Sequence, residues 1–97
     1  MAEQTEQPHL DVNTEEQVHH IPLYRVLLHN DDVNHARYVV KVLQEVFHRN
    51  QHDAEQIMLE AHSQGVALCV IEPLEKAEFH AERLTSAKLT ATIEPEG

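Results

Sequence analysis

The sequence is poor in cysteine and in basic charge, and each shortage excludes a class of protein. Cys69 is the only cysteine, so no intrachain disulfide can form, and its apolar neighbours predict a buried thiol in a reducing compartment such as the cytoplasm. Seven Lys and Arg stand against seventeen Asp and Glu, which gives a formal net charge of −10. We therefore expect neither nucleic acid nor an anionic membrane as a partner, because neither would find a basic surface.

Long apolar segments are also missing. No stretch approaches the roughly 20 apolar residues that a membrane span needs, and residues 1–22 have no apolar core of the signal-peptide type. A chain of 97 residues allows one small domain with a thin core. We therefore expect no deep active site for several substrates.

The composition changes near residue 22. Residues 1–22 contain five acids, none of the seven basic residues and no aromatic residue, which predicts a disordered acidic tail. The tail is either a solubilising appendage or a segment that docks to a partner, and composition leaves both open. The folded domain is expected at residues 23–97.

Hydrophobic periodicity in this domain predicts alternating strands and helices. The expected strands are at 23–29, 66–72 and 88–94. The expected helices are one of about four turns that starts near Asn34, a second at 53–64 and a third from 73 to about 83. Asn34 is expected to cap the first helix and Gly65 to end the second, with Pro73 in the first turn of the third. The packing side of the third helix is expected to be Ala77, Phe79, His80 and Leu84. The order β-α-α-β-α-β predicts an α+β domain, a three-stranded antiparallel sheet with helices packed on one side.

Polar side chains crowd the corner between the first strand and the first helix. Asn30, Asp31 and Asp32 follow directly on the run 23–29, which is expected to form the first strand. Adjacent carboxylates repel each other and raise each other's pKa, so this corner suits a cationic group placed between them. Acidic residues before a helix can also act only as caps, and spacing alone does not separate the two interpretations.

Four segments taken in order resemble the ClpS family, the adaptors of the bacterial Clp protease that recognise N-terminal degradation signals. They are YRVLLHNDDVN, RYVVKVLQEVF, IMLEAHSQGVALC and KLTATIE, and the likeness covers residues 23–94. By this resemblance the free α-amino group of a substrate is bound by Asn30, Asp31, Asp32 and His62. The pocket for the first side chain of the substrate corresponds to Leu28, Asn34, Ala36, Met58, Ala61 and Leu89.

The resemblance also implies partners and excludes some chemistry. The protein would be a cytoplasmic, monomeric, non-enzymatic adaptor without cofactor or metal, and it would deliver substrates with destabilising N-terminal residues to the N-terminal domain of a Clp AAA+ unfoldase. Glu75 matches an acidic position on the side by which family members approach the unfoldase, whereas His80 replaces a common lysine. The chain is then either a divergent adaptor or a ClpS-like module with another partner.

Two positions depart from the family pattern in the direction of smaller side chains. Ala36 stands where the family commonly has methionine, and Ala61 stands where valine is usual. Either the pocket is wider and admits Ile and Val beside Leu, Phe, Tyr and Trp, or neighbouring side chains fill the space. If His62 accepts a hydrogen bond from the amine, protonation of its ring should weaken binding in acid.

Two other functions are compatible with single features of the sequence. A metal-binding module is suggested by nine histidines, by the i, i+4 spacing of His48 and His52, and by combinations around His29, Asp31 and His62. No CxxC or HExxH motif supports this alternative. A small hydrolase built on His62 and an aspartate would lack a nucleophile, because Ser63 points about 100° away on the helix and Cys69 is expected to be buried.

Overall fold

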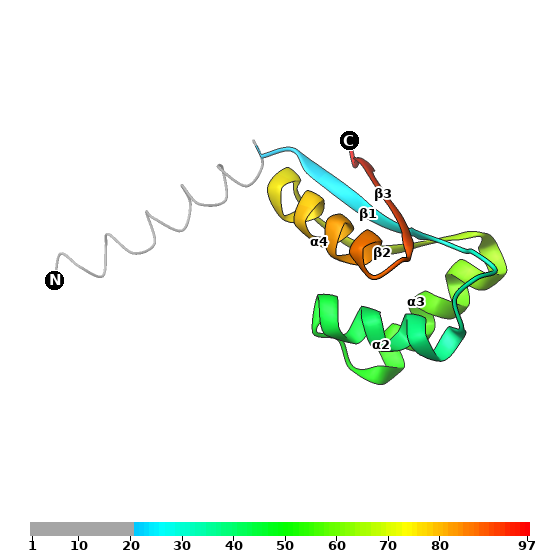
Figure 1. The fold of residues 1–97 in the computed structure, drawn as a ribbon. Coiled ribbons are helices and arrows are strands. Elements are labelled where there is room, and N and C mark those ends of the chain that lie inside the picture. The colour runs from blue at the N-terminus through cyan, green and yellow to red at the C-terminus, as the bar shows by residue number, and fades with distance from the viewer. Residues whose placement is uncertain (1–20) are drawn as a thin grey trace, which may run out of the picture.

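A computed structural model describes residues 21–97 of the chain. The elements are β1 (Leu23–His29), α2 (Ala36–Phe47), α3 (Gln51–Gln64), β2 (Val66–Pro73), α4 (Leu74–Ser86) and β3 (Thr90–Pro95) (Figure 1). The predicted α+β order is therefore confirmed. The acidic tail expected at residues 1–22 lies, apart from its last two residues, outside the described residues.

The sheet has the strand order β2-β1-β3, and both strand pairs are antiparallel. Successive residues of β1 point to opposite faces, so Val26 and Leu28 are buried while Leu27 is only partly covered. A bulge between Val26 and Leu27 shifts the register against β2. The face opposite the core leaves Leu68 and Ile71 of β2 exposed.

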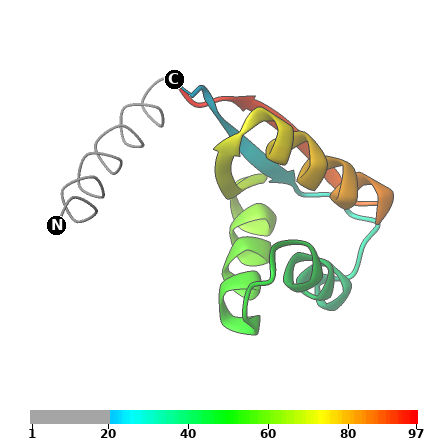
Figure 2. The same cartoon turned by 90° about the vertical axis from the view of Figure 1, so that its left-hand side faces the viewer.

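The helices cover one face of the sheet and extend past one end of it. Helix α4 lies along the sheet and contacts all three strands, while α2 and α3 form a pair below the sheet in Figure 1, an arrangement also clear in Figure 2. The largest fully buried side chains are Val26 of β1, Leu43 of α2 and Leu84 of α4, and they belong to one core. The site described below lies where the helix pair meets the end of β1.

Side chains at the helix ends explain where α3 and β3 begin. The Oδ1 atom of Asn50 accepts a hydrogen bond from the Asp53 amide at 2.8 Å, so α3 begins at Gln51 rather than at the expected residue 53. Gly65 has φ of 90° and ends the helix, as predicted. Strand β3 begins at Thr90 rather than at 88, because Lys88 has φ of 73° and therefore breaks the extended conformation.

Three predictions about helix ends and faces are wrong. His35, not Asn34, is the N-cap of α2, and it makes no capping side-chain bond. Pro73 is the N-cap of α4 rather than its first residue, and the helix runs on to Ser86. Phe79 is 52% exposed with the guanidinium of Arg83 5.6 Å from its ring centre.

The error at Phe79 has a geometric cause. Ala77 and Leu84 are fully buried and lie seven residues apart on one face of α4. Phe79 is two residues after Ala77, which turns it by about 200° around the helix and away from the sheet. Its aromatic character suggested a packing residue, but its position in the helix decides against that.

None of the three described helices combines the length and the apolar character that crossing a bilayer would require.

Candidate functional site

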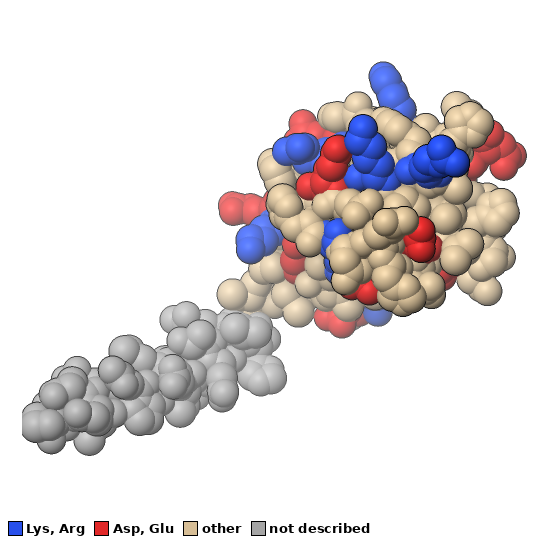
Figure 3. Space-filling view, turned by 90° about the horizontal axis from the view of Figure 1, so that it is seen from below, with Lys and Arg blue, Asp and Glu red and all other residues tan. Residues whose placement is uncertain are grey.

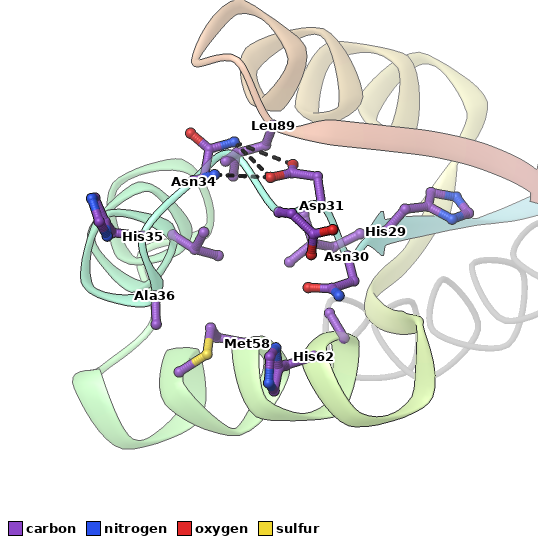
Figure 4. A pocket seen from close by; sticks show the side chains of 13 residues that line it. His29, Asn30, Asp31, Asn34, His35, Ala36, Met58, His62 and Leu89 are labelled. Atoms are coloured by element: carbon purple, nitrogen blue, oxygen red, sulfur yellow. Dashed lines mark hydrogen bonds between the residues drawn. The ribbon is translucent and has the colours of Figure 1, made fainter.

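A hollow of about 290 Å³ lies between the β1–α2 loop and the two helices α2 and α3. Its size is close to the lower end of ligand pockets and suits one side chain rather than a large cofactor. The residues that line it are Leu28, His29, Asn30, Asp31, Asp32, Asn34, His35, Ala36, Val39, Met58, Ala61, His62 and Leu89 (Figure 4). Every residue predicted for amine binding or for the side-chain pocket is among them.

Asp31 organises the polar end of the hollow. Its Oδ1 atom accepts hydrogen bonds from the amides of Val33 at 3.1 Å and Asn34 at 3.0 Å. The Nδ2 atom of Asn34 donates to both carboxylate oxygens at 3.2 Å. These bonds explain why Asn34 does not cap α2: its side chain is used to close the loop on Asp31.

The same bonds fix the charge of Asp31. The backbone hydrogen bond from Asn34 is the largest influence and, together with the bonds from the Asn34 side chain and the Val33 amide, lowers the pKa of Asp31, against the opposing effect of burial. The carboxyl group is therefore ionised at neutral pH. Asp32 beside it is exposed and makes no side-chain hydrogen bond within residues 21–97.

The loop is fastened at both ends. The amide of Asn30 donates to the carbonyl of Gly65, at the end of α3, at 3.0 Å. The Nδ2 atom of Asn34 donates to the carbonyl of Lys88, just before β3, at 2.9 Å. The polar groups of the loop are therefore held in place relative to α3 on one side and to the third strand on the other.

His62 brings the fourth predicted polar group to the hollow. It lies in the last turn of α3, one turn after Met58, and is exposed. Figure 4 shows the His62 ring and the Asn30 side chain beside each other, whereas the Asp31 carboxylate is turned toward Asn34. The carboxamide oxygen of Asn30 and a ring nitrogen of His62 can each accept a hydrogen bond.

The other end of the hollow is apolar. Leu28, Ala61 and Leu89 are between 2% and 4% exposed and form its inner wall. Met58 and Val39 are partly buried against the same core. Sequence reasoning did not include Val39 in the pocket, although its position three residues after Ala36 on the apolar face of α2 could have indicated it.

Two histidines at the rim point out of the hollow. Figure 4 shows the rings of His29 and His35 directed away from its centre, and His29 Nε2 lies 2.7 Å from Thr92 Oγ1. His48 and His52 do not share a helix, because His48 ends α2 in a left-handed conformation and His52 belongs to α3. The prediction that His48 and His52 lie one turn apart on a single helix, where they could bind a metal together, is therefore wrong. Within residues 21–97, no three His, Cys, Asp or Glu side chains gather as metal ligands.

The candidate nucleophiles are engaged or buried. Cys69 is 3% exposed, and burial raises the pKa of its thiol to about 12, so it carries no thiolate at neutral pH. Ser63 Oγ donates to the carbonyl of Glu60 at 3.5 Å, within its own helix. Neither side chain is among those that line the hollow.

The predicted docking residues on α4 differ in exposure. Glu75 is exposed in the first turn of the helix. His80 is half-buried: its Nδ1 atom donates to Glu72, and its ring lies 4.8 Å from the ring of Phe47. Glu72 is the one buried charged residue in the described part of the chain, and His80 supplies its partner. Sequence reasoning missed this pair.

Comparisons with known proteins point to one family. The family model described as ATP-dependent Clp protease adaptor protein ClpS matches residues 19–92. The ClpS adapter of Synechococcus sp. (strain CC9902) is 49% identical over 76 residues, which cover 77% of this chain and 73% of that protein. The chloroplastic CLPS1 adapter of Chlamydomonas reinhardtii is 51% identical over 77 residues, 78% of this chain and 48% of that protein.

A solved structure resembles the described fold. The structure of Agrobacterium tumefaciens ClpS2 bound to L-phenylalaninamide superposes with a TM-score of 0.74 and 34% sequence identity. The match covers 77% of this chain and 98% of that chain. Nearly the whole of that protein therefore has a counterpart here.

Proposed function

This chain belongs to the ClpS family of adaptor proteins of the ATP-dependent Clp protease, and on that premise we propose that it captures substrates by their first residue. The hollow binds the free α-amino group and the large hydrophobic side chain of an N-terminal Leu, Phe, Tyr or Trp. The adaptor then delivers the bound protein to a Clp unfoldase. The supporting observation is the placement of an ionised carboxylate and two further acceptors beside an apolar wall.

The polar end of the hollow suits an ammonium group. An ammonium has three donors and one positive charge, so it requires about three acceptors with negative charge close by. In our proposal Asn30, Asp31 and His62 accept its hydrogen bonds, and Asp32 adds charge from the exposed rim. Acetylation of the amine removes the charge and two of the donors, which leaves desolvated acceptors unpaired at a cost of about 1 to 3 kcal/mol each.

The apolar end suits the first side chain. Burial of a Leu or Phe side chain against the wall formed by Leu28, Val39 and Leu89 contributes roughly 1.5 to 3 kcal/mol. The two halves together, after the entropy cost of association, correspond to an affinity near the micromolar scale. The L-phenylalaninamide named for the Agrobacterium protein combines a free amine with one aromatic side chain, which is the ligand chemistry proposed here.

The small side chains at Ala36 and Ala61 widen the proposed specificity. Ala36 is exposed at the rim and Ala61 is part of the wall, so a β-branched first residue has room beside Met58. We therefore include Ile and Val among the accepted first residues.

The remaining parts of the proposal concern partners and place of action. The protein acts as a monomeric, non-enzymatic adaptor in the cytoplasm, and its relatives include both bacterial and chloroplastic proteins. Glu75 is exposed and His80 is half-buried on α4. Both belong to the surface that docks on the N-terminal domain of the unfoldase. Neither a metal nor a cofactor takes part.

Binding of a labelled peptide tests this function. A fluorescent ten-residue peptide that begins with Leu is titrated with the protein, and its N-acetylated twin serves as the matched control. We expect binding of the free peptide and a loss of at least about 100-fold on acetylation, because charge and donors disappear together. Equal binding of the two peptides, or binding of neither, would falsify the proposal.

A further inference from the structure

A second groove begins where the apolar end of the hollow opens to solvent. Its lining residues are Ala36, Arg37, Val40, Gln51, Glu55, Met58 and Leu59, from α2 and α3. Ala36 and Met58 also line the hollow. The hollow and the groove therefore meet across these two side chains and form one trough along α3.

A small side chain stands where the hollow and the groove meet. Ala36 lies opposite Met58 and projects only a methyl group toward it (Figure 4). A longer side chain at this position would reach across the trough and separate the hollow from the groove. The trough thus runs from His62, in the hollow, past Ala36 to Gln51, in the groove.

The spacing along α3 matches the length of a short extended peptide. Glu55 precedes His62 by seven residues, which is about 10 Å of helix at 1.5 Å per residue. An extended chain advances about 3.3 Å per residue, so a peptide whose amine lies at His62 reaches the level of Glu55 with its third residue. The inner wall closes the hollow at Leu28 and Leu89, and Ala36 is exposed at its rim, so the peptide has a way out past Ala36.

We propose that this groove binds the second and third residues of the substrate and that Arg37 favours an acidic third residue; the inference rests on the amine-binding function proposed above. Met58 and Leu59 form an apolar floor of the groove. The Leu59 side chain is 51% exposed among residues 21–97, so it is available for contact with a substrate. The second residue contacts this floor. The third residue lies between the groove's two charged side chains, Arg37 and Glu55.

The two charged side chains of the groove, Arg37 and Glu55, differ in whether they already have a partner within the described chain. Arg37 is exposed and forms no salt bridge with another residue in the range 21–97. Glu55 already accepts a hydrogen bond from Gln51 Nε2 at 3.0 Å, which directs its carboxylate along its own helix. Figure 3 looks onto the end of the molecule that carries α2 and α3, and basic side chains gather along one edge of it. An acidic substrate residue therefore finds a free partner in Arg37.

A length series tests whether the groove is occupied. Leucinamide, Leu-Ala amide, Leu-Ala-Glu amide and a six-residue Leu-Ala-Glu peptide compete against the labelled Leu peptide for the intact protein. We expect affinity to rise to the tripeptide and then level off. Leucinamide as tight a competitor as the six-residue peptide would overturn the assignment.

A charge exchange tests the role of Arg37. Peptides that begin Leu-Ala-Glu and Leu-Ala-Lys are compared on the natural protein and on Arg37→Glu, with Lys76→Glu as a control that makes the same charge change on α4, outside both the hollow and the groove. We expect the natural protein and the control to prefer the Glu peptide by about threefold, and Arg37→Glu to reverse the order. An unchanged order in Arg37→Glu would overturn the role of Arg37.

The two proposals fail in different ways. If free and acetylated peptides bind alike, the amine-binding function is wrong and the groove loses its basis. If the preference for a free amine persists while peptide length and the third residue have no effect in any variant, only the groove assignment is wrong.

Discussion

The two ends of the hollow are built by different means. At the polar end, Asp31 and Asn34 are connected to each other, to backbone amides and to the Lys88 carbonyl, so each polar group has one position. At the apolar end, no side-chain hydrogen bond within the described chain involves Ala36, Met58 or Ala61, and the shape follows from side-chain volume alone.

This difference separates recognition from selectivity. A hydrogen-bonded end responds sharply to the loss of a single atom, because the remaining partners are left unsatisfied. An end made of packed side chains changes by degrees, since each methyl group adds or removes a small volume. For the function proposed here we therefore expect the amine to be a fixed requirement and the choice of first side chain to change with one substitution.

The largest effect is expected from the centre of the polar end. Asp31→Ala should weaken binding of the free Leu peptide by about 100-fold or more, because both the charge and the acceptor of the loop amides are lost. Asp31→Asn keeps an oxygen for those amides and should lose about tenfold. Fluorescence anisotropy measures both, and circular dichroism checks that the variants fold. A loss at the exposed Asp32→Asn equal to that at Asp31→Ala would contradict the leading role of Asp31.

A change at the apolar end should alter selectivity without abolishing binding. Ala36→Met fills the rim, so the amides of Ile and Val, which are too short to enter the groove, should lose about tenfold in affinity while leucinamide loses much less. Competition of these amides against the labelled Leu peptide, read by anisotropy, measures this. Gln44→Met adds a similar side chain to α2 outside the hollow and should leave all affinities alone. A uniform loss for all first residues would show that Ala36 does not control selectivity.

Acid should act on the polar end alone. A protonated imidazole has no acceptor left on its ring and repels an ammonium, so acid should weaken binding through His62. Asp31 stays ionised in mild acid because its pKa is lowered, so it should not contribute to this loss. Titration of His62→Asn should give a flatter profile. A flat profile in the natural protein would exclude His62 as an acceptor.

The lowered pKa of Asp31 also has a consequence for stability. A carboxyl group whose pKa is lower in the folded protein stabilises the fold above its unfolded pKa, and that contribution disappears as pH falls through the folded value. For Asp31 the loss therefore begins only below about pH 4. The contribution of Asp31 is fully present at both pH 5 and pH 8, so thermal melts at these two pH values should show no difference that is due to Asp31.

The smallest effect is expected at the connection between the loop and β3. Asn34→Ala removes the donor to the Lys88 carbonyl but leaves the backbone bonds to Asp31, so affinity should fall only about three- to fivefold. Thr92→Ala removes a hydrogen bond outside the hollow, that with His29, and should not change affinity. If Asn34→Ala lowers peptide affinity as much as Asp31→Ala does, the hydrogen bond from Asn34 to Lys88 matters more to the loop than we infer.

The sequence alone was sufficient to predict the role of a residue when only one structural role is favourable for that residue. Gly65 follows an amphipathic helix, and a left-handed residue is needed there, so its role was predictable and is confirmed. Asn34 was not predictable, because a carboxamide can cap a helix or close a loop, and only the position of Asp31 decides between them. Spacing likewise gave no indication that Glu72, at the end of an apolar run, turns inward to meet His80 eight residues later.

The double attachment of the loop has a mechanical consequence. In the function proposed here, a substrate held by its first residue would be pulled through the rest of its length, and the tension would reach residues 30–34. The hydrogen bond from Asn30 to Gly65 connects this loop to the end of α3, and the hydrogen bond from Asn34 to Lys88 connects it to the start of β3. We therefore expect the force on the loop to be shared between two attachments on different elements.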